Sequence, residues 1–90
     1  MPNTKRDYKK LLESGNKAQL EKLKNNEHKS GFENLDIDYA FERLKEEVHE
    51  LLVELQGVKE RNPSDIRSEA ADVANFAYMI ILKCDQEINK

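Results

Sequence analysis

Acidic side chains on two helical segments are the residues of this chain best suited to chemistry. Asp72 and Asn75 are the only polar residues within the apolar run 70–82, and Glu69 stands immediately before that run. Glu69, Asp72 and Asn75 are spaced i, i+3 and i+6, which places them on one side of a helix. A carboxylate in apolar surroundings is costly unless something pairs with it. The pattern therefore predicts that Glu69 and Asp72 bind a cation.

A second acidic cluster lies upstream, in the segment 46–50 with the sequence EEVHE. Residues three apart on a helix project within about 60° of each other, so Glu47 and Glu50 form one pair of oxygen ligands. Glu69 and Asp72 form a second pair by the same spacing. Four neighbouring carboxylates repel one another and resist ionisation without a cation. Mg²⁺ and Mn²⁺ are hard ions that prefer oxygen ligands, so the two pairs predict a site for one of these metals.

Two long helices are expected to position these acids. Apolar residues recur at intervals of 4, 3, 4, 3, 4 and 3, which is typical of a heptad-type helical seam. The seam consists of Ile37, Phe41, Leu44, Val48, Leu51, Leu55 and Val58. Asp36 is the expected cap of this helix, and Asn62-Pro63 is its expected end. Ser64 is the expected cap of the last helix, over residues 65 to about 87, and the short break predicts an antiparallel hairpin.

The N-terminal part of the chain is predicted to differ from the rest. Residues 1–31 carry eight Lys/Arg and four Asp/Glu, a balance of +4, whereas residues 32–90 carry seven and fourteen, a balance of −7. Thr4 can cap a short helix that Gly15 ends, and Asn16 can cap a second short helix. We therefore expect a single domain in which short basic helices and a loop (1–31) precede the helical hairpin with the acidic site (32–90).

Composition favours a small all-α domain. Charged residues make up 37% of the chain and hydrophobic residues 38%, with three Gly and two Pro, and this mix is typical of a helical protein. The longest apolar run is too short for a membrane span, which needs about 20 residues. A polar N-terminus and a single cysteine, Cys84, indicate a cytoplasmic protein. The last helix is apolar almost all round, so we expect a helical bundle completed by oligomerisation, as a homodimer or homotetramer.

The two acidic segments together resemble the MazG-like all-α nucleoside triphosphate pyrophosphohydrolases. The pattern of that family is E-E-x-x-E, a variable spacer and E-x-x-D, and residues 46–51 and 69–76 match all five acidic positions. The resemblance covers roughly residues 28–83 and implies hydrolysis of a (d)NTP to a (d)NMP and pyrophosphate. It implies Mg²⁺, or Mn²⁺, as the cofactor. The metal ligands that it implies are Glu47, Glu50, Glu69 and Asp72, with Glu46 as an outer ligand or a group that orients water.

The hydrolysis that this resemblance implies suits the acidic residues. The metal would neutralise the triphosphate and lower the pKa of a bound water, and Glu46 or Glu50 would take the proton of that water. The segment before the first long helix is expected to help form the nucleotide pocket, where Phe32 stacks on a base and Lys29 meets a phosphate beside His28. Alternatively, Phe32 only anchors this loop and His28 is merely exposed.

Asn75 has two interpretations. It lies one turn beyond Asp72, where it would hydrogen-bond the sugar or base of the substrate. Alternatively, it pairs with a backbone group across the bundle.

Two other functions compete with this one. Glu46 and His49 form an E-x-x-H pair of the kind that di-iron carboxylate bundles use, although the last helix offers no histidine. A non-enzymatic helical interaction module is the second alternative. The densest basic patch consists of Lys5, Arg6, Lys9 and Lys10. Because little aromatic character accompanies this patch and the whole chain is acidic, we expect neither a nucleic-acid nor a membrane partner.

Overall fold

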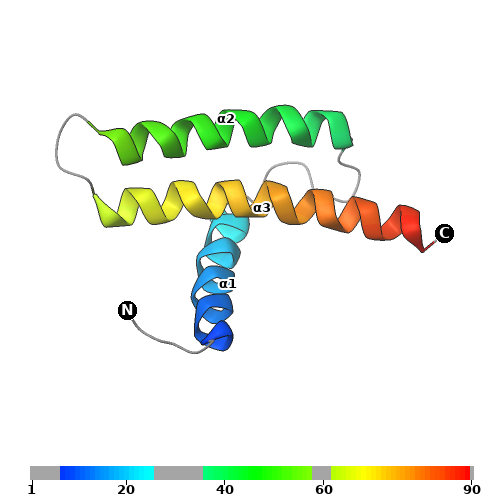
Figure 1. The fold of residues 1–90 in the computed structure, drawn as a ribbon, viewed down its shortest axis with the longest axis horizontal. Helices are drawn as coiled ribbons and strands as arrows, with labels where there is room; N and C mark the ends of the chain where they lie inside the picture. The colour runs from blue at the N-terminus through cyan, green and yellow to red at the C-terminus, as the bar shows by residue number, and fades with distance from the viewer. Residues whose placement is uncertain (1–6, 26–35, 58–61, 90) are drawn as a thin grey trace.

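The computed structural model describes residues 7–25, 36–57 and 62–89. These segments fold into three α-helices, α1 (Tyr8–Asn25), α2 (Ile37–Gln56) and α3 (Pro63–Ile88). Helices α2 and α3 lie side by side and run in opposite directions, whereas α1 crosses α3 and packs on it (Figure 1). The predicted all-α architecture with an antiparallel hairpin is confirmed for the described residues. Oligomerisation is a property of several chains and stays a prediction.

Side-chain caps define where the two hairpin helices begin. Asp36 caps α2 as expected, because its Oδ2 accepts a hydrogen bond from the backbone N–H of Tyr39 at 3.1 Å. The predicted Ser64 cap of α3 is wrong, because Asn62 takes this role. Its Oδ1 accepts from the backbone N–H of Ser64 at 2.9 Å and of Asp65 at 3.2 Å. Pro63 fits the first helical position, since its missing N–H would have no helical partner there.

Helix α1 is one continuous helix, so the predicted break at Gly15 between two short basic helices is wrong. A glycine inside a helix costs only about 1 kcal/mol relative to alanine, and most residues around Gly15 are good helix formers. The helix also gains tertiary packing beyond the glycine, because Ala18 and Gln19 are buried. Arg67 of α3 adds an ion pair to Glu21 at 2.9 Å. These contacts favour continuing the helix over ending it at Gly15.

The face that α2 turns toward α3 is offset by one residue from the predicted seam. Apart from Arg43, the less exposed positions of α2 are Ala40, Leu44, Glu47, Leu51 and Glu54. Leu44 and Leu51 belong to both sets. Phe41 and Val48, which were predicted for the seam, are instead 53% and 45% exposed. The offset places Glu47 between α2 and α3. It leaves half of the predicted apolar stripe on the outer side of α2.

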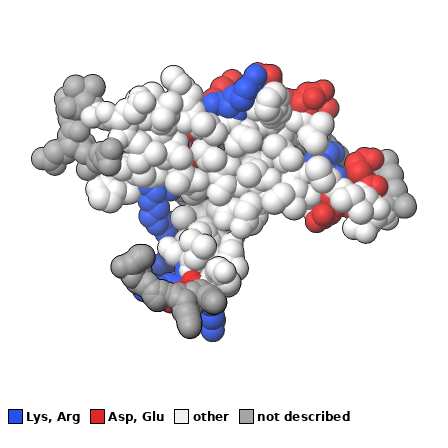
Figure 2. All heavy atoms as spheres, in the orientation of Figure 1, with Lys and Arg blue, Asp and Glu red and all other residues white. Residues whose placement is uncertain are grey.

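The described residues bury little apolar volume. Their buried apolar residues are Ala18, Ala40 and Ala71, and none of their large side chains is fully enclosed. Large apolar residues such as Leu52 and Ile81 are exposed on the hairpin. On the face seen in Figure 2, charged side chains gather at the rim of the hairpin and leave its middle largely uncharged. A single chain thus leaves apolar surface uncovered.

Among the described helices, none combines the length and the apolar character that crossing a bilayer requires.

Candidate metal centre

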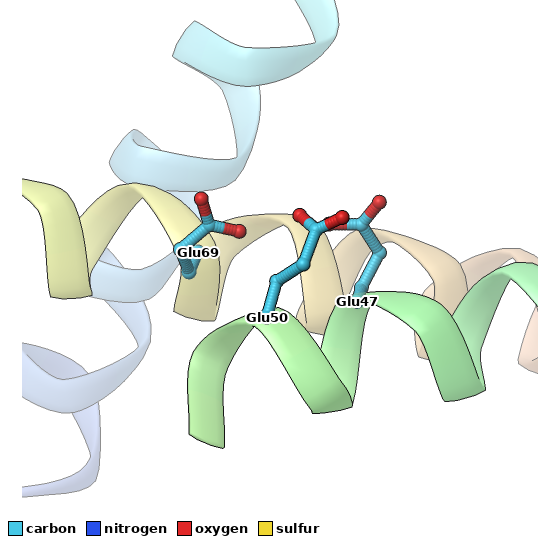
Figure 3. A group of neighbouring side chains, drawn as sticks. All are labelled: Glu47, Glu50 and Glu69. Carbon is cyan, nitrogen blue, oxygen red and sulfur yellow. The ribbon is translucent and has the colours of Figure 1, made fainter. Parts of the chain in front are cut away.

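Three glutamates from the two hairpin helices converge on one point. Glu47 and Glu50 project from α2 and Glu69 projects from α3, and their carboxyl groups point toward one another (Figure 3). One oxygen of each residue lies within 4.8 Å of the corresponding oxygens of the other two. The i, i+3 spacing places the first two on one side of α2, and the antiparallel packing brings the third opposite them. The structure therefore brings together three of the four predicted ligands, which we call the glutamate triad.

Two oxygens of the glutamate triad are buried without a partner. Glu47 is only 5% exposed. Its Oε1 and the Oε1 of Glu69 have no hydrogen-bond partner among the described residues. A buried acceptor left unsatisfied costs about 1–3 kcal/mol, and more when it is charged. Both oxygens belong to residues of the triad, and a cation bound among the three carboxylates would supply a partner for buried oxygens of this kind.

The electrostatics of the triad favour uptake of positive charge. Burial raises the pKa of Glu47, and the negative charges of Asp72 and Glu50 raise it further, while Arg43 opposes them. Burial also raises the pKa of Glu69, and the negative charges of Glu50, Asp72 and Glu47 add to the rise. Glu47 and Glu69 thus resist ionisation, first because of their burial and second because their neighbours are acids. Either protons or a cation can relieve this repulsion.

Arg43 of α2 holds one side of the triad in place. Its Nη2 donates to Oε2 of Glu47 at 2.9 Å, which leaves Oε1 as the oxygen without a partner. Its Nη1 pairs with the exposed carboxylate of Glu46. The guanidinium also lies over the ring of Phe76 on α3, 5.1 Å from its centroid. Glu46, the predicted outer ligand, is therefore engaged by Arg43 outside the triad.

Asp72, the fourth predicted ligand, pairs with α1 rather than joining the triad. Its Oδ2 lies 3.2 Å from Nζ of Lys22. The same Nζ donates to Oγ of Ser68 at 3.0 Å. The charge of Asp72 still contributes to the raised pKa values of Glu47 and Glu69. Asp72 is therefore an electrostatic neighbour of the triad, with Lys22 as its counter-charge.

The structure describes one of the four predicted substrate-binding residues, Asn75. The other three, His28, Lys29 and Phe32, lie outside the described residues. Asn75 is 6% exposed, and its Nδ2 donates to the backbone carbonyl of Gln19 on α1 at 3.2 Å. This is the contact that the second interpretation of Asn75 describes.

The E-x-x-H pair of the di-iron alternative does not take part in the triad. His49 is exposed, and the triad holds carboxylates alone. Glu46, the other member of the pair, is bound by Arg43. The oxygen-only donor set is one that Mg²⁺ and Mn²⁺ prefer.

Comparisons of this chain with protein-family models, with curated proteins and with solved structures found no match. The geometry of the glutamate triad is therefore the evidence for a site in this chain.

Sequence reasoning missed two residues of this centre, Arg43 and Lys22. Arg43 carries a local signal, because it precedes Glu46 by three residues and Glu47 by four, which is the spacing of ion pairs on a helix. Lys22 carries no local signal. Its partners Ser68 and Asp72 are distant in the chain, and only the packing of α1 on α3 brings them together.

Proposed function

We propose that this chain is a metal-dependent nucleoside triphosphate pyrophosphohydrolase, which cleaves a (d)NTP to a (d)NMP and pyrophosphate. One observation supports it above all: three carboxylates from two helices converge within 4.8 Å, and two of them carry buried oxygens without partners. The acids involved are those of the E-E-x-x-E and E-x-x-D segments, which resemble the MazG-like enzymes. The resemblance supports the substrate class of the proposal, and the geometry of the triad supports its metal.

The residues present fit Mg²⁺ or Mn²⁺. Glu47, Glu50 and Glu69 would hold the ion, and Asp72 would add negative charge beside it. A bound divalent cation would neutralise triphosphate oxygens and lower the pKa of a coordinated water. Arg43 fixes the carboxylate of Glu47 by binding Oε2 and leaves Oε1 without a partner among the described residues.

Glu50 is the best-placed proton acceptor of the acids. It belongs to the triad and is exposed, so that water reaches it. Glu46, which the resemblance also offers, is paired with Arg43 instead. We therefore assign to Glu50 the removal of a proton from the attacking water.

Association of two or more chains is part of the proposal. The buried apolar residues of the described segments are three alanines, and large apolar side chains of α2 and α3 stay exposed. A helix that is apolar almost all round needs cover on several sides. A second copy of the chain, presenting the same outward half of α2 and the same faces of α3, would provide that cover as a homodimer or homotetramer.

Release of pyrophosphate tests the proposed activity. Purified chain with Mg²⁺ is offered ribonucleoside, deoxyribonucleoside and base-modified triphosphates, and pyrophosphate is measured. We expect release from at least one substrate, loss of release with EDTA, and loss in Asp72→Asn and Glu69→Gln. Glu13→Gln, which changes an exposed acid of α1, should keep full activity. No release from any substrate, in a folded protein, would favour the non-enzymatic interaction module.

A further inference from the structure

Lys22 is the one described residue of α1 that an ion pair links to the acids of the metal centre. Its Nζ lies 3.2 Å from Oδ2 of Asp72, and the two side chains are only 27% and 21% exposed. The other ion pair between α1 and α3 joins Glu21 to Arg67, on more exposed surface. A partly buried ion pair resists screening by salt better than an exposed pair does. Lys22 therefore couples the docking of α1 to the charge of the acidic centre.

Asp72 is electrostatically linked to the triad. Its negative charge contributes, after burial, to the raised pKa values of both Glu47 and Glu69. Glu47, a member of the triad, is more than nine-tenths buried, and its Oε1 has no partner among the described residues. Arg43 supplies one positive charge from α2 itself. Lys22 supplies another, and it does so from a different helix.

We propose that Lys22 is a built-in counter-cation of this centre, so that docking of α1 and binding of a divalent cation at the glutamate triad oppose each other. The proposal depends on the metal site of the proposed function. A divalent cation at the triad would offset the negative charge of its three glutamates, which adds to that of Asp72 in attracting the ammonium group of Lys22. It would also repel that group directly. Helix α1 is then an autoinhibitory element that a cation weakens.

Thermodynamic linkage makes the coupling reciprocal. If docking of α1 lowers the affinity for the cation, then the cation lowers the stability of the docked α1 by the same factor. Among the described residues, the other contacts that hold α1 on α3 include the exposed Arg67–Glu21 pair, the Asn75 hydrogen bond to the Gln19 carbonyl, and the burial of Ala18 and Gln19. A bound cation would act against these contacts, so we expect it to loosen α1 rather than to unfold the hairpin.

Mn²⁺ affinity tests the first half of the proposal. Full-length wild type, Lys22→Gln and Lys24→Gln are titrated with Mn²⁺ by calorimetry at one protein concentration. Lys24 is the matched control, because it is an exposed lysine in the same last turn of α1. We expect Lys22→Gln to bind Mn²⁺ at least about fivefold more tightly than wild type, the lower end of typical coupling between sites. Lys24→Gln should stay within about twofold.

Hydrogen exchange tests the second half without any variant. Saturating Mn²⁺ should accelerate exchange of the backbone amides of residues 16–25 in the wild type, relative to those of α2 and α3. Unchanged or weaker Mn²⁺ binding by Lys22→Gln would overturn the proposal, and so would slower exchange in α1 with Mn²⁺. Either result would leave the metal site standing if the wild type binds Mn²⁺. A wild type that binds no Mn²⁺ would overturn both proposals.

Discussion

Replacing Glu69 by Gln should reverse the effect of divalent cations on stability. In the absence of metal, Glu69 faces Glu47 and Glu50, and their repulsion contributes to its raised pKa. The substitution keeps the shape of the side chain and removes one of the like charges. We therefore expect Glu69→Gln to be more stable than wild type without divalent cations. With saturating Mn²⁺ the order should reverse, because the variant lacks one ligand.

The expected gain in stability of Glu69→Gln without metal follows from the separation of the carboxylate oxygens in the triad. For two unit charges 4.8 Å apart, the upper limit for the separation of the three converging oxygens, Coulomb repulsion is about 0.9 kcal/mol in water and about 3.5 kcal/mol at an effective dielectric constant of 20. Uptake of a proton by Glu69 relieves part of this repulsion in the wild type. We therefore expect a net gain near the lower bound, about 1 kcal/mol, or a rise in Tm of about 4–8 °C for a chain of this size.

The reversed order of stability with saturating Mn²⁺ follows from mass action. At a Mn²⁺ concentration one hundred times Kd, binding stabilises the wild type by about 2.7 kcal/mol, which exceeds the gain of the variant. Thermal and urea unfolding of both proteins, at equal concentration with EDTA or with Mn²⁺, measure these differences. Glu13→Gln is the control and should stay within about 0.5 kcal/mol of wild type in both conditions. A variant less stable than wild type in EDTA, or equally stabilised by Mn²⁺, would refute the reasoning.

Three further predictions concern pH, packing and association. The pKa values of Glu47 and Glu69 are raised, so their contribution to stability is fully present below pH 4.5 and is lost as the pH rises through the raised values. In EDTA, the advantage of Glu69→Gln over wild type should therefore be near zero at acid pH and grow toward neutral pH, as urea titrations at several pH values can measure. Asn75→Ala removes a buried hydrogen bond to the Gln19 carbonyl. It should lower the free energy of unfolding by about 1 kcal/mol, as measured with urea and without any nucleotide present. Asn25→Ala changes an exposed residue and should lower it by less. Ile81→Glu places a charge at an exposed apolar position of α3 and should shift sedimentation toward the monomer, whereas Gln86→Glu should not.

The hairpin and its acids could be predicted from local sequence signals. The apolar periodicity over 37–55 and the apolar run 70–82 indicate helices α2 and α3, and Asp36 caps α2 as predicted. The i, i+3 spacing of Glu47 and Glu50 then directs both to one side of α2. These features depend on neighbours within a few residues, which is the range that sequence periodicity describes.

Features that depend on packing between helices could not be predicted in this way. The continuity of α1 through Gly15 comes from burial of Ala18 and Gln19 against α3, which outweighs the local cost of glycine. The pairing of Lys22 with Asp72 comes from the crossing of α1 over α3. Neither contact has a fixed spacing in sequence, so neither leaves a local pattern.

The offset between the predicted seam and the observed inward face of α2 links the site to association. Turning α2 by about 100°, one residue of a helix, would carry Phe41 and Val48 toward α3 and carry Glu47 away from Glu69. The chain therefore cannot cover its whole apolar stripe and assemble the glutamate triad with the same pair of helices. Among the described residues, the outer half of the stripe stays exposed, and we expect another surface to cover it. A second chain would supply that surface without moving Glu47, which is why the acidic site and an oligomer belong to one hypothesis.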